Sequence, residues 1–135
     1  MNEQSLLNKV LPTLKQGPDI AVGPGDDCAA IDVGGDKLLL IATDQVIANI
    51  HYDKTDTTPQ EAAKKLLRRN ISDIAAMGGT PAHALLTIAT ACQQEQWFCD
   101  FFKGITQEAE KWDISVCGGD LSSTTSNDEV CTLTI

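Results

Sequence analysis

The sequence predicts a single α+β domain, because helical stretches with apolar stripes alternate with short apolar strands along its 135 residues. Helical spacing of apolar side chains is found at residues 3–16, 59–77 and 94–112. Apolar runs of strand length are found at residues 29–32, 37–43, 82–91, 114–117 and 130–135. A chain of this length can bury about two thirds of its unfolded surface, so it needs no disulfide or metal in order to fold.

Composition argues against nucleic-acid and membrane partners. The net charge of −9 and the pI near 4.4 argue against a polyanion or an anionic membrane as partner, because such a partner would need a basic face. The N-terminus has no apolar run long enough for a signal peptide, and the longest apolar run, 38–42, is too short to span a membrane. The five cysteines form an odd set without a C-x-x-C pair, which predicts reduced, mostly buried thiols: Cys28, Cys92, Cys99, Cys117 and Cys131. We therefore expect a soluble, cytoplasmic protein.

The helix expected at 59–77 carries an aspartate near its end. Pro59 suits a first helical turn, and Gly78-Gly79 is a stop signal, so Asp73 should lie in or near the last turn. There the helix dipole disfavours a carboxylate by about 0.3 to 1 kcal/mol. Position alone leaves two interpretations: a solvent-facing or capping residue, or an aspartate that points at a cation together with Asn70.

The glycine-rich segment 22–31 delivers two consecutive carboxylates, Asp26 and Asp27, into the start of a strand. Consecutive side chains of an extended chain point to opposite sides, so we expect one of the two to be structural. The segment is neither a P-loop nor a dinucleotide fingerprint, because no Gly-Lys-Ser/Thr follows. The turn at 34–36 then predicts a hairpin between the strands on either side of it.

The strand at 37–43 should end in Thr43 and Asp44, with a loop over 45–58 that contains His51. Ligands commonly collect where strands end. An isolated Asp44 is nevertheless more typical of a turn or a cap, and a lone loop histidine of an exposed surface position.

Four basic residues cluster at i, i+4 spacing on the helix at 59–77: Lys64, Lys65, Arg68 and Arg69. A solvated basic face, with Glu61 paired to Lys65, is the favoured interpretation, and a face directed at phosphate is the alternative. The aromatic residues of the helix at 94–112 are interpreted as core or subunit contacts.

The last third of the chain predicts a short strand that runs into a Gly118-Gly119 turn tipped by Asp120. Small residues there would let a ligand approach the backbone. A polar, flexible segment over 122–128 and a final strand follow.

Four separate elements therefore end in a carboxylate: Asp27, Asp44, Asp73 and Asp120. If the four converged on one cleft they would repel one another unless divalent cations neutralised them, and oxygen ligands select Mg²⁺. Mg²⁺ held by a few carboxylates completes its shell with water and substrate phosphates. Nucleotide phosphate chemistry is the function that this pattern favours.

The motifs that carry these carboxylates also form an ordered set: Gly25-Asp-Asp-Cys-Ala29, Thr43-Asp44 with His51, Asn70-Ile-Ser-Asp-Ile-Ala-Ala-Met-Gly-Gly79 with Pro81, and Gly118-Gly-Asp120. With this set the chain resembles, over nearly all of its length, the N-terminal half of thiamine-monophosphate kinase, in the superfamily of aminoimidazole ribonucleotide synthetase.

The resemblance implies phosphorylation of thiamine monophosphate to thiamine diphosphate with ATP and Mg²⁺, by direct in-line transfer. It implies magnesium ligands at Asp27, Thr43, Asp44, Asp73 and Asp120, ATP beside Gly119 and Asp120, and the thiamine substrate near His51. The implied fold is a four-stranded, mainly antiparallel sheet with helices on one face, like the N-terminal domain of aminoimidazole ribonucleotide synthetase. Sheets of two subunits would pair in a homodimer, with the sites at the interface.

The sequence departs from the family pattern at several places. Ala42 stands where the family usually has a hydroxyl residue, residues 121–125 replace a run such as Thr-Thr-Arg, and Arg68-Arg69 replaces a more apolar pair. Residues 1–135 would form the N-terminal ATP- and Mg-binding domain. The C-terminal domain of the family is absent from this chain, so groups that complete the ATP and thiamine sites would lie outside it.

Two alternatives stay open. One is another ATP-dependent enzyme of the superfamily, although a selenophosphate synthetase would need a reactive cysteine before the glycine turn, and no cysteine precedes Cys28. The other is a Mg-nucleotide-binding and dimerisation module without turnover by itself, because half a site rarely positions two substrates. We expect no covalent nucleophile, since Asp27 beside Cys28 would make the thiol a poorer one.

Overall fold

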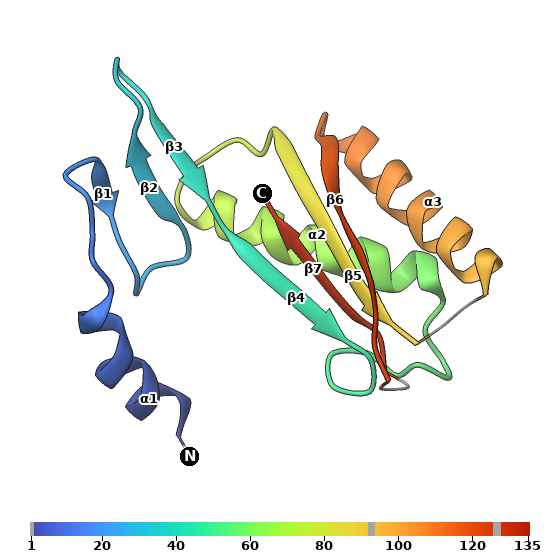
Figure 1. Cartoon of the computed structure of the whole chain (residues 1–135). Helices are drawn as coiled ribbons and strands as arrows, with labels where there is room; N and C mark the ends of the chain where they lie inside the picture. Colours follow the sequence, from blue (N-terminus) through green and yellow to red (C-terminus); the bar gives the residue numbers. More distant parts are fainter. Residues whose placement is uncertain (1, 92–93, 126–127) are drawn as a thin grey trace.

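The structure, a computed structural model, describes residues 2–91, 94–125 and 128–135. The elements follow one another in the order α1 (Glu3–Val10), the 3₁₀ turn η1 (Leu11–Thr13), β1 (Ile20–Val22), β2 (Ala29–Asp32), β3 (Leu38–Ile41), β4 (Thr43–Ile47), α2 (Pro59–Ala76), β5 (His83–Thr90), α3 (Glu95–Lys111), β6 (Ser115–Ser123) and β7 (Val130–Thr134). Figure 1 shows α1 and the first three strands as a small lobe beside a larger lobe that contains the other elements.

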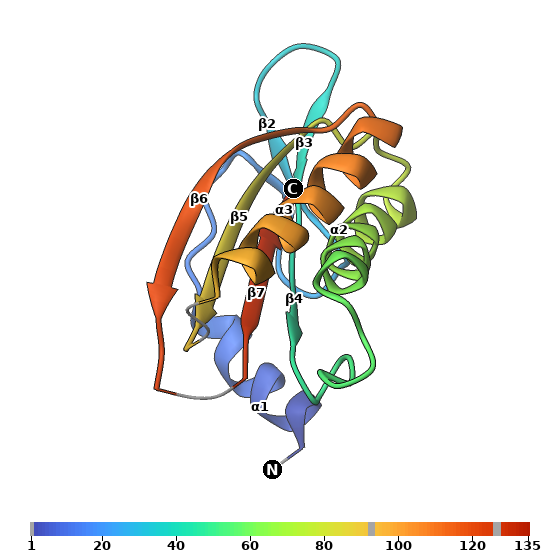
Figure 2. The ribbon, with the colours of Figure 1, turned by 90° about the vertical axis from the view of Figure 1, so that its right-hand side faces the viewer.

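The larger lobe is a four-stranded sheet in the order β4-β7-β5-β6. The central strand β7 is antiparallel to both neighbours, and only β5 and β6 run parallel. Both long helices, α2 and α3, lie on the same face of this sheet (Figure 2). The expected α+β fold, with a mainly antiparallel four-stranded sheet and helices on one face, is confirmed.

The core lies between the two helices and the sheet. Phe101, Leu66 and Ile88, from α3, α2 and β5, are each no more than 1% exposed. The two helices approach closely at Gly104, where a Cβ atom would lie 2.6 Å from the Gln60 carbonyl oxygen. A side chain at this position would push the helices apart, so glycine is required there.

The smaller lobe holds a three-stranded antiparallel sheet in the order β1-β2-β3 that the sequence did not predict as a separate sheet. Its β2–β3 hairpin is confirmed, whereas β1 was missed. The expected strand 37–43 is in fact two strands that meet at Ala42. The Ala42 N–H and C=O both bond to Ile135, at 3.0 and 2.9 Å, so the chain changes sheets there without leaving extended conformation.

Two further expectations about element boundaries were wrong. The segment expected as a loop over 45–58 begins as strand, because β4 pairs with β7 as far as Ile47. The expected Gly118-Gly119 turn lies inside β6, which pairs with β5 from Ser115 to Ser123. The flexible segment predicted over 122–128 is therefore strand at its start, and its residues 126–127 lie outside the described part of the chain.

The cysteines were expected to be mostly buried, and this is wrong for half of the four that are described. Cys28 and Cys131 are buried, but Cys99 and Cys117 are exposed, and Cys92 lies outside the described residues. No helix in the described ranges is both long enough and apolar enough to cross a membrane.

A buried carboxylate joins the two helices. Glu108 of α3 is 1% exposed, and it accepts hydrogen bonds from Arg68 Nε at 2.6 Å, Lys111 Nζ at 3.0 Å and Trp112 Nε1 at 3.4 Å. The Arg68 hydrogen bond outweighs burial, so the pKa of Glu108 is lowered to about 2. A buried charge with partners on two helices stabilises the fold only while it is ionised.

We expect the Glu108 carboxylate to contribute to pH-dependent stability in acid. Its folded pKa is depressed below the usual value of 4.5, so its contribution is complete above about pH 4.5 and is lost as the pH falls toward about 2. The variant Glu108→Gln should be less stable than the wild type at pH 7 and should lose less stability between pH 4.5 and pH 2. Melting curves across this range test the prediction, and parallel profiles for the two proteins would contradict it.

Candidate functional site

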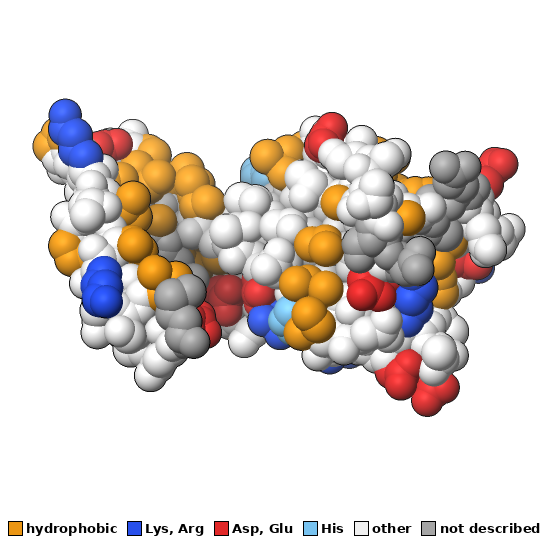
Figure 3. All heavy atoms as spheres, turned by 60° about the horizontal axis from the view of Figure 1, so that its bottom comes forward, with side chains coloured by type: hydrophobic (Ala, Val, Ile, Leu, Met, Phe, Trp, Pro, Cys, Tyr) orange, Lys and Arg blue, Asp and Glu red, His pale blue; other side chains and the backbone are white. Residues whose placement is uncertain are grey.

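Asp73 lies in the last turn of α2, as predicted, and it is half-buried within electrostatic range of other carboxylates. Burial raises the pKa of Asp73, and the charges of Asp44 and Asp27 raise it further, whereas Arg69 opposes the shift. These carboxylates come from α2, β4 and the loop before β2. Figure 3 shows acidic side chains gathered beside basic ones where the two lobes meet.

Asn70 fixes the position of α2 against β4. It is fully buried, and its Oδ1 accepts a hydrogen bond from the Asp44 backbone N–H at 3.1 Å while its Nδ2 donates to the Leu66 carbonyl at 3.0 Å. One of the two interpretations had Asn70 point at a cation with Asp73, but its side chain is hydrogen-bonded to backbone groups of β4 and α2. Its effect on the site is to hold Asp44 close to α2.

Asp44 is a strand residue in an ion pair, and the turn or capping role is wrong. Its Oδ2 accepts from Arg69 Nε at 2.6 Å, and its Oδ1 accepts from Arg69 Nη2 at 3.0 Å and from the Gln45 N–H at 2.8 Å. Burial raises the pKa of Asp44, but the bonds from Arg69 and Gln45 outweigh it and leave the pKa lowered. One indication in the sequence that Arg69 has a special role is that Arg68-Arg69 stands where the family has a more apolar pair.

Asp26 fits the expectation that one of the two aspartates of the glycine-rich loop is structural. Asp26 accepts a hydrogen bond from the Asp27 N–H at 2.9 Å and so shapes the loop. The charge of Asp27 acts on its neighbours, because burial, Asp73, Asp27 and Asp26 together raise the pKa of the Cys28 thiol. A buried thiol with a raised pKa is a poor nucleophile, which supports the expectation that Cys28 is not one.

Thr43 and His51 lie on either side of Asp44 along the chain. Thr43 is exposed, and its hydroxyl lies within hydrogen-bond distance of the Leu133 carbonyl and the Thr134 hydroxyl, both at 3.2 Å. His51 Nδ1 accepts from the Ile47 N–H at 3.0 Å, so Nε2 carries the proton of a neutral ring. Lys65 bonds to the His51 carbonyl oxygen and so ties the loop to α2.

Asp120 lies apart from the other carboxylates. In the strand pairing Asp120 lies opposite Thr87, whose side chain is exposed. Asp44 lies opposite Leu133, whose side chain is buried against the helices. The side chains of Asp120 and Asp44 therefore point to opposite faces, and they belong to opposite edge strands, roughly 14 Å apart at three strand spacings. Asp120 accepts a hydrogen bond from the Ser122 hydroxyl at 2.8 Å.

Gly119 allows β6 to lie close against β5. Its φ is +156°, and a Cβ atom there would collide with the Leu86 carbonyl oxygen. Glycine is therefore needed here for strand packing, and the expected approach of a ligand to this backbone stays a prediction.

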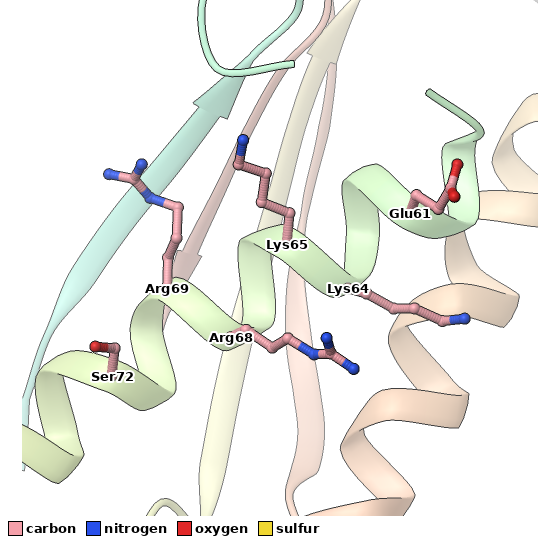
Figure 4. A pocket seen from close by; sticks show the side chains of 6 residues that line it. All are labelled: Glu61, Lys64, Lys65, Arg68, Arg69 and Ser72. Atoms are coloured by element: carbon pink, nitrogen blue, oxygen red, sulfur yellow. The ribbon is translucent and has the colours of Figure 1, made fainter. Parts of the chain in front are cut away.

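The basic face of α2 borders a groove of about 520 Å³, lined by Glu61, Lys64, Lys65, Arg68, Arg69 and Ser72 (Figure 4). Both arginines are solvated in part, with side chains 59% and 39% exposed, but each also makes an ion pair, Arg68 with Glu108 and Arg69 with Asp44. The expected Glu61–Lys65 pair is replaced by a capping box in which Glu61 bonds to Thr58.

The donor set fits a hard cation in its chemistry, because carboxylate and hydroxyl oxygens are the ligands that Mg²⁺ prefers. Within the described ranges, no three His, Cys, Asp or Glu side chains lie close enough to hold a metal ion by themselves. Mg²⁺ commonly binds through only one or two carboxylates and takes its remaining ligands from water and phosphates. Asp73, with Asp27 or Asp44, suits that mode of binding.

Comparison with known families places this fold. The family described as AIR synthase related protein, N-terminal domain, matches residues 25–135, and the chain belongs to this family. Within it, the chain is similar to thiamine-monophosphate kinases. It is 35% identical over 129 residues to the one from Rhodopirellula baltica, and 34% identical over 102 residues to the one from Escherichia coli.

These matches cover most of the chain but only part of each relative. They include 90% and 76% of this chain, which spans 41% and 31% of the two relatives. A solved structure described as AaThiL complexed with AMPPCP and TMP has a TM-score of 0.81 and 26% sequence identity, covering 98% of this chain and 41% of that one. The resemblance to thiamine-monophosphate kinase is thus confirmed at the level of the N-terminal portion.

We expect Asp73→Asn to leave the metal-free protein as stable as the wild type or slightly more stable. The substitution keeps the size and removes a charge that opposes the helix dipole, a gain of about 0.3 to 1 kcal/mol, which corresponds to a few degrees in melting temperature. Because the folded pKa of Asp73 is raised, the gain should be complete above that pKa and vanish below its usual value of 3.8.

Melting curves in EDTA at pH 7 and pH 3 measure this gain. The matched control is Asp36→Asn in the exposed β2–β3 turn, which should change neither curve. A clear loss of stability at pH 7 in Asp73→Asn alone would show that the carboxylate is a structural cap.

Proposed function

We propose that this chain is the magnesium- and nucleotide-binding domain of an enzyme that phosphorylates thiamine monophosphate to thiamine diphosphate with ATP. The observation that carries the proposal is the group of carboxylates Asp27, Asp44 and Asp73, brought near one another by three elements of a domain of this family. Similarity to a protein solved with AMPPCP, an ATP analogue, and TMP supports the choice of substrates.

Each site residue has a role in this proposal. Asp27, Asp44 and Asp73 would hold magnesium on the helix-covered side of the sheet, and Asp120 and the Thr43 hydroxyl would hold magnesium on the exposed side. Gly119 would let the nucleotide approach β6, and His51 would face the thiamine substrate with Nε2. Bound magnesium neutralises charge on the transferring phosphoryl group.

The chemistry proposed is direct in-line transfer without a covalent intermediate. The cysteine nearest the carboxylates, Cys28, is buried, and its thiol pKa is raised. Phosphoryl transfer asks a protein mainly for positioning and charge neutralisation, which carboxylates with a metal provide. The domain would lie in the cytoplasm, where ATP and thiamine phosphates are available.

We also propose that the domain works as a homodimer. The exposed face of the sheet carries Leu85, which is 49% exposed. Beside it a groove of about 400 Å³ runs along β3 and β5 and includes Leu39, which is 48% exposed. A sheet with helices on only one face needs a cover for the other, and a second copy would supply it.

Dimerisation also bears on the completeness of the site. Within one chain Asp44 and Asp120 point to opposite faces of the sheet, so one cation cannot bind both, and the Asp120 of each chain lies on the face that a second copy would cover. The alternative function, a nucleotide-binding and dimerisation module without turnover by itself, suits the 135 residues taken alone.

Thiamine diphosphate formation tests the proposed activity. We expect the full-length protein to convert thiamine monophosphate with ATP and Mg²⁺, and residues 1–135 alone to bind nucleotide without turnover. In the full-length protein, Asp73→Asn should lose roughly 100-fold or more in kcat/KM, because a metal ligand supplies several kcal/mol. Cys28→Ala, a matched change beside Asp27, should keep its turnover.

Ligand-induced stabilisation gives a second measurement on the same proteins. Mg²⁺ with AMPPCP at about 100 times the dissociation constant stabilises a competent protein by roughly 2.7 kcal/mol, on the order of 10 °C for a domain near this size. Asp73→Asn should lose most of this increment. An equal increment in wild type and variant would refute Asp73 as a ligand, and loss of turnover in a folded Cys28→Ala protein would refute transfer without a cysteine nucleophile.

Sedimentation tests the proposed dimer. We expect a dimer at micromolar concentration, and Leu85→Lys on the exposed face of β5 should dissociate it because a charge would be buried at the interface. Leu14→Lys, at a position that is 52% exposed in the small lobe, is the control. A wild-type protein that sediments as a monomer at that concentration would refute the proposed homodimer.

A further inference from the structure

The ion pair between Arg69 and Asp44 uses the same oxygens that a cation would need. The guanidinium binds both of them, through Nε at 2.6 Å and Nη2 at 3.0 Å. Figure 4 shows Arg69 pointing from α2 toward β4, whereas the adjacent Arg68 points toward α3. Such a bidentate pair is the geometry in which arginine binds carboxylate best.

The position of Arg69 makes it a counter-ion for more than one carboxylate. It lies one helical turn before Asp73, and the two charges interact. Among the ion pairs of the described residues, Arg69–Asp44 is the one that involves these carboxylates. The arginine therefore offsets part of the repulsion among carboxylates that magnesium would otherwise offset.

We propose that Arg69 is a tethered counter-ion that competes with magnesium for the Asp44 carboxylate. A divalent cation and a guanidinium cannot hold the same two oxygens, and they repel each other at contact distance. Magnesium binding at Asp44 thus requires the arginine to swing away. This inference rests on the magnesium assignment of the proposed function and adds a residue that tunes its affinity.

The pair is accessible enough to open. The Arg69 side chain is 39% exposed and that of Asp44 is 23% exposed, so water can replace the bonds that break. Partly exposed pairs are weak. The expected effect on magnesium affinity is therefore modest, about two- to fivefold.

Arg68 provides a matched control on the same helix. It makes an ion pair of the same length, 2.6 Å, but with Glu108 of α3. Replacing either arginine removes one positive charge from neighbouring positions on α2. A difference between the two variants thus isolates the contact with Asp44 from the general effect of charge.

The test is calorimetric titration of the nucleotide-free, full-length protein with Mg²⁺ alone. We expect Arg69→Met to bind Mg²⁺ about two- to fivefold more tightly than the wild type, and Arg69→Lys, which keeps the charge without the fork, to fall between them. Arg68→Met should change the affinity much less.

Melting curves supply a readout that does not depend on turnover. In EDTA both Met variants should melt below the wild type, because each leaves a carboxylate without its partner. Added Mg²⁺ should restore more of the loss in Arg69→Met than in Arg68→Met.

Each other result overturns the inference. Equal changes in affinity for the two Met variants would mean a general charge effect, and weaker Mg²⁺ binding in Arg69→Met would mean that Arg69 positions Asp44 for the metal. Absence of Mg²⁺ binding in all proteins would refute the metal assignment itself. If Arg69→Met binds Mg²⁺ more tightly but the full-length protein forms no thiamine diphosphate, the proposed function is wrong. The competition between Arg69 and Mg²⁺ for Asp44 would still hold.

Discussion

The arrangement of the candidate site depends on the side chain of Asn70. Its amide is fully buried and bridges the backbone of β4, at Asp44, to the backbone of α2, at Leu66. A buried amide that loses its hydrogen-bond partners costs about 1 to 3 kcal/mol. This bridge therefore fixes the position and the orientation of α2 relative to β4. With α2 held in this way, Arg69 and Asp73, on either side of Asn70 along the helix, lie close to Asp44.

Carboxylates held close together repel one another and destabilise the fold, and a nearby arginine offsets part of this repulsion. Asp73 is placed against the helix dipole and near two other acids, and its pKa is raised in consequence. Arg69 neutralises Asp44, whose pKa is lowered. Because one arginine cannot serve all of these carboxylates, a metal-free domain keeps a local excess of negative charge. Such an excess of negative charge is typical of a binding site for a cation, where the function is kept at a cost in the stability of the free protein.

The sequence predicted the long helices and the class of sheet, because their apolar periodicity is strong and their caps are explicit, as at Thr58 and Pro59. It could not predict the change of sheet at Ala42, since an uninterrupted apolar run looks the same whether its strands pair with β2 or with β7. It took Gly118-Gly119 for a turn, because the need for glycine there comes from the Leu86 backbone on another strand. The Arg69–Asp44 pair was missed for the same reason, as 24 intervening positions hide a contact that only the packing of α2 on β4 creates.

The distribution of the carboxylates over both faces of the sheet limits what one chain can do. Asp44 and Asp73 lie on the side that α2 covers, whereas Asp120 points to the exposed side from the opposite edge strand. No rotation of side chains can bring these groups together, because roughly three strand spacings and the sheet itself lie between them. Mg²⁺ tolerates this separation, since it needs only one or two carboxylates and takes the rest of its shell from water and phosphates. In the proposed dimer a second copy would cover the exposed face and bring its own Asp120 there, whereas Asp44 and Asp73 would stay on the side that α2 covers, so the proposed dimer bears on the Asp120 side of the site.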